Sequence, residues 1–135
     1  MPTLLEIVAP DRLLLAQPVD MVVIPASEGD MGVLPGHSPM IVLLRGGTIT
    51  LHEGGRPTAQ LYVSGGFAEV TPERCTVLAD EATPVAEVSR AAGEARLRDA
   101  EAEYAATDKM NVPAVEAAMA RMQSARAMIA ASGSA

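Results

Sequence analysis

The sequence predicts an α+β fold in which an antiparallel β-sandwich or barrel is followed by a two-helix hairpin. Up to about residue 84, short runs of β-branched and other apolar residues alternate with Gly and Pro turn signals, a pattern typical of strands joined by tight turns. Beyond that point alanine is abundant, glycine is scarce and charged residues recur at helical spacing. Because no helical segment separates the strands, an antiparallel arrangement is favoured.

The strands can be assigned in order along the first segment. Those predicted are Thr3–Val8, Val19–Ile24, Pro39–Leu44, Gly47–Leu51, Ala59–Val63, Phe67–Thr71 and Arg74–Leu78. Between the second and third of these, Met31, Val33 and Leu34 can form a further short strand or a bulge. The paired glycines at 46–47, 54–55 and 65–66 lack the spacing of a phosphate-binding loop. They are predicted to lie in hairpin turns.

The second segment predicts two antiparallel helices, Glu87–Ala106 and Val112–Ala131, joined by a turn at 107–108. Asn111 is the predicted N-cap of the second helix, and Pro113 lies in its first turn, where a missing N–H costs little. Residues stepping by three and four along this helix predict an apolar seam with one polar interruption: Val112, Val115, Met119, Met122, Arg126 and Ile129. The facing helix is rich in alanine, so we expect a hairpin that buries little apolar area and opens easily.

Composition excludes several classes of function. The net charge of −7 argues against binding to nucleic acid and to anionic lipid surfaces. A single cysteine, Cys75, can form neither an internal disulfide nor a thiolate cluster, and with only two histidines no metal site is expected. No apolar run approaches the roughly 20 residues of a membrane span, and no targeting signal precedes the first strand. We therefore expect a protein of cytoplasmic type.

The segment IPASEGDMGVLPGH, residues 24–37, places turn residues and two acids between two apolar runs. Its Pro35-Gly36 pair is a type II turn signature. Ser38 follows His37, but adjacent residues seldom adopt the geometry of a catalytic triad and no nucleophile elbow is present, so no catalytic residue is predicted. Two interpretations of Glu28 and Asp30 stay open: a solvated loop face, or an acidic surface aimed at a basic partner with His37 beside it.

This segment, continued through Ser38 and Pro39, resembles the signature segment of the epsilon subunit of F-type ATP synthases. Similar stretches follow in the family's order and spacing at 46–49, 64–70 and 77–82. The resemblance is close from Thr3 to Ala82 and continues as a hairpin pattern to about Ala131. It implies a β-sandwich of about ten strands that docks on the rotor (residues 1–84) and a regulatory helical hairpin (residues 85–135).

The resemblance further implies a non-catalytic rotor-stalk subunit of a proton-translocating ATP synthase. Such a subunit links the gamma subunit to the c-ring and lies, as a peripheral part of the complex, on the cytoplasmic side of the bacterial plasma membrane. Its hairpin can extend between the catalytic alpha and beta subunits and inhibit ATP hydrolysis. The resemblance implies a surface that faces the c-ring loops, which carry a basic residue in the family: Ser27, Glu28, Gly29, Asp30, Met31 and His37.

Some members of the family bind ATP at the hairpin through an Ile/Leu-Asp-x-x-Arg-Ala motif. Residues 86–91 here are AEVSRA, which keep Arg-Ala but not the aliphatic residue or the Asp. Arg121 and Arg126 are five residues apart, whereas two arginines four apart would share a helix face. We therefore expect no cofactor. An ATP-binding sensor that acts on its own stays open as the alternative function. An enzyme built on the sandwich is a third hypothesis. The candidate nucleotide contacts would be Glu87, Arg90, Arg121 and Arg126.

Overall fold

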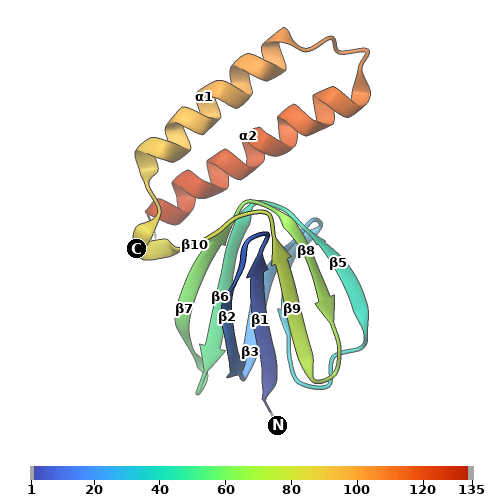
Figure 1. The fold of residues 1–135 in the computed structure, drawn as a ribbon, viewed down its shortest axis with the longest axis vertical. Coiled ribbons are helices and arrows are strands. Elements are labelled where there is room, and N and C mark those ends of the chain that lie inside the picture. Colours follow the sequence, from blue (N-terminus) through green and yellow to red (C-terminus); the bar gives the residue numbers. More distant parts are fainter. Residues whose placement is uncertain (1, 134–135) are drawn as a thin grey trace.

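The computed structural model describes residues 2–133. Ten strands are followed by a short 3-10 helix, η1 (Val85–Glu87), and by two packed helices, α1 (Arg90–Ala106) and α2 (Val112–Ser132) (Figure 1). The predicted α+β class is confirmed. Residue 1 of the predicted sandwich segment and residues 134 and 135 of the predicted hairpin segment lie outside the described residues. The strands are β1 (Thr3–Ala9), β2 (Arg12–Val19), β3 (Met21–Ala26), β4 (Gly29–Val33), β5 (Met40–Leu44), β6 (Gly47–Glu53), β7 (Arg56–Val63), β8 (Gly66–Val70), β9 (Arg74–Ala79) and β10 (Ala82–Pro84).

The strands follow the order β10-β7-β6-β3-β5-β8-β9-β1-β2, and β4 pairs with β3 outside this path. Among the described strands every pairing is antiparallel except that of β1 with β9, which is parallel. The sheet curves so that alternate side chains of its strands enter one common core built from Val, Leu, Ile and Ala. This core includes the fully buried Leu5, Ile7, Val22, Ile24, Val33, Ile49, Leu51, Val63, Val70 and Val77.

Three of the observed strands were absent from the direct sequence prediction or only suggested by it. β2 contains Leu13, Leu14, Leu15 and Ala16, which favour helices as much as strands, and Pro18, which is tolerated because β2 lies at the edge of the sheet. β4 contains two glycines among five residues, and β10 has only three residues. Their weak strand propensity therefore gave no clear strand signal in the sequence, and pairing with neighbouring strands stabilises them.

The helix termini follow the capping chemistry. Asn111 accepts a hydrogen bond from the backbone N–H of Ala114 at 3.3 Å, so the predicted N-cap is confirmed. α1 begins at Arg90 rather than Glu87, because Ser89 accepts a hydrogen bond from Ala92 N–H at 3.1 Å and caps the helix there.

The predicted seam of α2 is wrong in part of its membership. The side chains of Val112 and Met119 are 56% and 52% exposed, and the buried positions of α2 are Ala118, Ala125, Met128 and Ala131. Alanine occupies three of these four positions and allows close approach, whereas the larger Met128 is buried in the cluster with Tyr62 and Val85. At Gly93 of α1, an added Cβ would lie 2.9 Å from Ile129 Cγ1.

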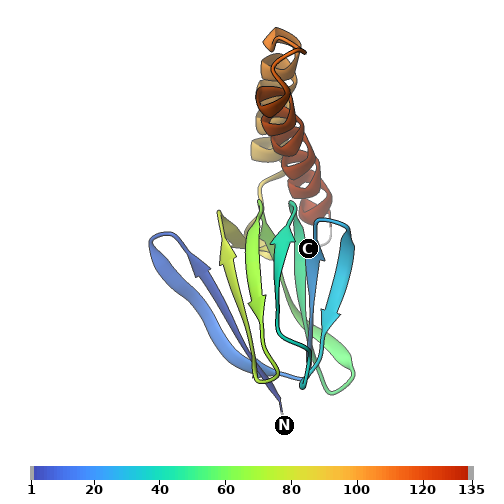
Figure 2. The ribbon, with the colours of Figure 1, turned by 90° about the vertical axis from the view of Figure 1, so that its right-hand side faces the viewer.

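The hairpin stands at one end of the sandwich, away from the N-terminus, and α2 is the helix nearer to the strands (Figures 1 and 2). In residues 2–133, no helix combines the length and the apolar character that a membrane crossing requires. Two separate apolar clusters result: the large core inside the sandwich, and a small cluster of Tyr62, Val85, Met128 and Ala131 beneath the hairpin.

Candidate functional site

The acidic turn joins β3 to β4. Its geometry is set by the register Ala26↔Gly29 and by Ser27 N–H, which donates to Leu43 O at 2.8 Å. Gly29 has φ +138°, a conformation that favours glycine. Glu28 and Asp30 are exposed, whereas Met31 is half-buried and packs against the core. The turn therefore presents two carboxylates to the outside.

His37 does not lie beside this turn, so that part of the prediction is wrong. Ser27 lines a pocket together with Ala120 and Gln123 of α2, which places the acidic turn at the end of the sandwich that carries the hairpin. Gly36 N–H, next to His37, donates to Pro72 O at 2.8 Å, in the turn between β8 and β9 at the opposite end. The separation arises because Met31–Val33 belong to a regular strand, β4, rather than to a compact bulge.

The hairpin meets the sandwich through a small set of directional contacts. The side-chain amide of Gln123 pairs with the backbone of Gly46: Gly46 N–H donates to Oε1 at 2.9 Å, and Nε2 donates to Gly46 O at 2.7 Å. The Tyr62 hydroxyl lies 3.0 Å from Ser124 O and 2.8 Å from Ser124 Oγ. Burial raises the pKa of Tyr62, so its hydroxyl keeps its proton and can donate.

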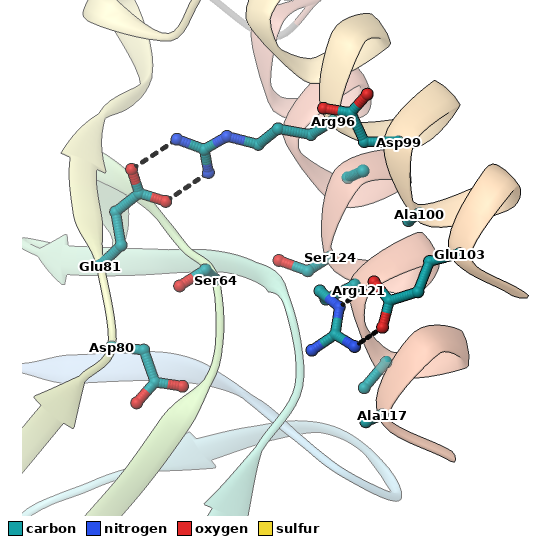
Figure 3. A pocket seen from close by; sticks show the side chains of 12 residues that line it. Ser64, Asp80, Glu81, Arg96, Asp99, Ala100, Glu103, Ala117, Arg121 and Ser124 are labelled. Carbon is teal, nitrogen blue, oxygen red and sulfur yellow. Dashed lines mark hydrogen bonds and ion pairs between the residues drawn. The ribbon is translucent and has the colours of Figure 1, made fainter. Parts of the chain in front are cut away.

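A pocket of about 640 Å³ lies between the hairpin and the loops of the sandwich (Figure 3). Arg96 of α1 reaches across it and binds both carboxylate oxygens of Glu81, at 2.5 and 2.9 Å, which lowers the pKa of Glu81. Arg121 of α2 pairs in the same way with Glu103 of α1. The charged residues that line the pocket are four acids and two arginines: Asp80, Glu81, Asp99, Glu103, Arg96 and Arg121.

The candidate nucleotide contacts do not gather around this pocket. Arg121 lines it, but its guanidinium is bound by Glu103. Arg90 is the first residue of α1 and pairs with Glu94 at 3.0 Å, while Glu87 ends η1 and Arg126 is exposed on α2. A polyphosphate in the pocket would meet more carboxylates than guanidinium groups. Among residues 2–133, no group of three or more His, Cys, Asp or Glu side chains is placed to hold a metal ion.

A second surface, which the sequence analysis missed, crosses the outer face of the sheet. Register places Leu43 opposite Phe67, Phe67 opposite Leu78, Leu78 opposite Val8, and Val8 opposite Leu13, so one apolar row runs over β5, β8, β9, β1 and β2. Leu43, Phe67 and Leu13 are 62%, 45% and 56% exposed. Ile41, two residues before Leu43 on the same face of β5, is 71% exposed. The sequence signal that could have revealed this surface is Met40–Leu44. This uninterrupted apolar run places apolar side chains on both faces of strand β5.

Comparisons with known proteins agree with this architecture. The family model described as the β-sandwich domain of the ATP synthase delta/epsilon chain matches residues 3–85. The ATP synthase epsilon chain of Granulibacter bethesdensis is 64% identical over 127 residues, which cover 94% of this chain and 94% of the relative. That of Gluconacetobacter diazotrophicus is 50% identical over 133 residues, covering 98% and 94%.

Among solved structures, a chain of the Euglena gracilis mitochondrial ATP synthase (OSCP/F1/c-ring) has a TM-score of 0.76 and 26% identity, covering 96% of this chain and 81% of its own length. A chain of the central stalk/c-ring of the Tetrahymena thermophila mitochondrial ATP synthase has a TM-score of 0.66 with 13% identity, covering 98% and 97%, and shows the fold alone. The match of its sandwich to the family model and the relatives that align over nearly its full length show that the chain belongs to the ATP synthase epsilon chain family.

Proposed function

We propose that this epsilon chain, a non-catalytic subunit of ATP synthase, works in the central stalk, where it joins the gamma subunit to the c-ring of a proton-translocating enzyme. The complex would hold it as a peripheral component on the cytoplasmic side of the bacterial plasma membrane. We further propose two domains, a rotor-docking sandwich (residues 1–84) and a regulatory hairpin (residues 85–135). The Tetrahymena chain, which has the same fold, comes from a central stalk and c-ring, and this origin supports the location by analogy.

The observation that carries the proposal is the exposed apolar row. Monomeric proteins rarely expose large contiguous apolar patches to water, and large patches mark interaction sites. The row follows neighbouring strands over the sheet, so it offers a broad surface on a rigid scaffold. We assign the gamma subunit to this face, and its apolar area supplies the affinity for a stable subunit contact.

The ring contact is assigned to the turn Ser27–Met31. Its carboxylates, Glu28 and Asp30, are exposed, and they complement the basic residue that the family resemblance implies for the c-subunit loops. His37 is left out of this contact, because it lies at the other end of the sandwich.

Reconstitution tests the assignment to the stalk. The chain is added to ATP synthase of Granulibacter bethesdensis from which the native epsilon chain has been removed, and the mixture is separated by size. We expect the chain to elute with the complex that contains gamma and the c-ring. Elution only as a free 14.0 kDa protein would contradict the proposal and favour an independent module.

Reversing the charges of the acidic turn should weaken the ring contact. In the double variant Glu28→Lys, Asp30→Lys, like charges meet at the interface with the c-ring. We expect the variant to associate with the ring more slowly and to couple poorly at low salt, and we expect added salt to reduce both effects. The measurement is coupling of proton flow to ATP synthesis in reconstituted vesicles at low and high salt. Because both side chains are exposed, thermal stability should stay within about 0.5 kcal/mol of the parent. Normal coupling at low salt would exclude this turn from the ring contact.

Removal of the hairpin tests its regulatory role. The sandwich has its own core, whose described members all lie at or before Ala82, so a chain ending at Pro84 should remain folded. We expect reconstituted complexes with this shortened chain to assemble and to hydrolyse ATP modestly faster than complexes with the full chain. Loss of assembly would show that the hairpin is a structural clamp rather than a regulator.

A further inference from the structure

The structure assigns to Gly46 and Gln123 the role of a latch that holds the helical hairpin on the sandwich, with Gly46 as a seat whose missing side chain lets α2 approach. The assignment concerns docking of the hairpin in the free protein. It goes beyond the proposed regulation and stands whether or not docking changes ATP hydrolysis.

The seat is fixed to the sandwich rather than to the hairpin. Gly46 lies in the loop between β5 and β6, where the preceding Arg45 N–H donates to Pro25 O at 3.0 Å. On the other side, a Cβ on Gly47 would lie 2.6 Å from Pro25 Cβ, so the loop packs directly on β3. The Gly46 amide and carbonyl are thereby held in place before α2 arrives.

Gln123 matches this seat in both hydrogen-bonding senses. A carboxamide offers one acceptor and two donors, and here its Oε1 accepts from Gly46 N–H while its Nε2 donates to Gly46 O. Gly46 is buried in the docked state. An unpaired buried backbone group costs more than the net gain of a hydrogen bond, so the pairing selects Gln at this position of α2.

Close approach explains the glycine. A Cβ added at Gly46 would have its three nearest neighbours in Ser124, at 2.6 Å from Cα and 3.0 Å from both Cβ and Oγ. Gly46 is not among the glycines with positive φ, so alanine can adopt its backbone conformation. A methyl group here would therefore act as a wedge between α2 and the sandwich without straining the loop.

The remaining docking contacts are too few to keep the hairpin in place against such a wedge. The apolar cluster under the hairpin is small, and the Glu81–Arg96 pair is substantially exposed, with side chains 38% and 46% accessible. The Tyr62–Ser124 contacts involve the same residue that the wedge would displace. The latch therefore controls whether the hairpin is docked or released.

The test uses the full-length chain with spin labels at Glu73→Cys, in the β8–β9 turn, and Met110→Cys, in the turn between the helices. Cys75 is buried, and burial raises its pKa to about 11, so it stays unlabelled. These two positions lie at opposite ends of the molecule (Figure 1), so we expect a single long distance in the parent and a broad distribution that extends to shorter distances in Gly46→Ala. The matched control is Gly32→Ala, where φ is also not positive and the nearest atom to the new Cβ, Met21 Sδ, is at an ordinary 3.5 Å.

Amide hydrogen exchange provides the second readout. Gln123→Glu keeps the shape of the side chain but removes the donor to Gly46 O. The hairpin should then undock more often, and exchange of the Gly46 N–H should accelerate roughly tenfold, while amides of the interior strand β6 are unchanged. Gln60→Glu, an exposed site on β7, is the control for charge. An unchanged distance distribution in Gly46→Ala would overturn the assignment. So would equal acceleration of exchange in β6, because the substitution would then destabilise the sandwich itself.

Discussion

Valine in place of Gly66 is expected to destabilise the sandwich by about 3 kcal/mol or more, because backbone strain and overpacking each cost about 1–3 kcal/mol. Gly66 has φ +133°, and a Cβ there would lie 2.1 Å from Leu78 O and 3.0 Å from Ala79 Cα. These are backbone atoms of a central pairing, Gly66↔Ala79, and they cannot turn aside as a flexible side chain would.

Urea denaturation measures this effect, and Gly36→Val separates its two causes. Gly36 also has positive φ, +83°, but its added Cβ would meet nothing within 4 Å. We expect Gly36→Val to lower the free energy of unfolding only by the cost of backbone strain, about 1–3 kcal/mol. Equal midpoints for the two variants would show that the contact with strand β9 contributes nothing.

Lysine at two positions of the apolar row, Leu43→Lys with Phe67→Lys, is expected to prevent stable binding of the gamma subunit. Apolar anchors at the centre of an interface cost about 2 kcal/mol or more when removed, or roughly 30-fold in affinity, and buried charges add to this loss. Co-elution with the reconstituted complex measures the effect. Because both side chains already point to the outside, the isolated variant should keep its folded circular dichroism spectrum.

The matched control is Gln60→Lys, which adds a charge to an exposed position of β7, away from the row. It should elute with the complex like the parent chain. Normal assembly of the double lysine variant would remove the apolar row from the gamma contact and would leave its exposure unexplained.

Local signals were enough to predict the change from strands to helices near residue 84, the N-cap at Asn111 and most of the long strands. They failed where tertiary context decides the structure. Leu13 and Ala16 lie in a strand because β1 offers them an edge, and Met119 is exposed whereas Met128 of the same helix is buried in the cluster with Tyr62 and Val85. Periodicity reports that a helix has an apolar stripe, but the partner surface decides which stripe is buried.

The candidate sites show the same limit at longer range. The composition of residues 27–31 revealed an exposed acidic turn, but not its place beside α2, because the direction of β4 is set by pairing with β3. The apolar row joins residues from five strands, and Gly46 meets Gln123 across 77 positions of sequence. No short window of sequence contains both partners of such a contact.

The parallel pairing of β1 with β9 has a consequence for the order in which the protein folds. These strands are 70 residues apart in register, and β1 lies between β9 and the edge strand β2 in the sheet. During synthesis, the β1–β2 ribbon must therefore wait with one side unpaired until β9 has left the ribosome. Such non-local pairing predicts folding on a scale of about milliseconds to seconds. The hairpin, rich in local contacts and made last, can form its helices within microseconds, so closure of the sheet rather than helix formation sets the rate at which a newly made chain becomes competent to join its complex.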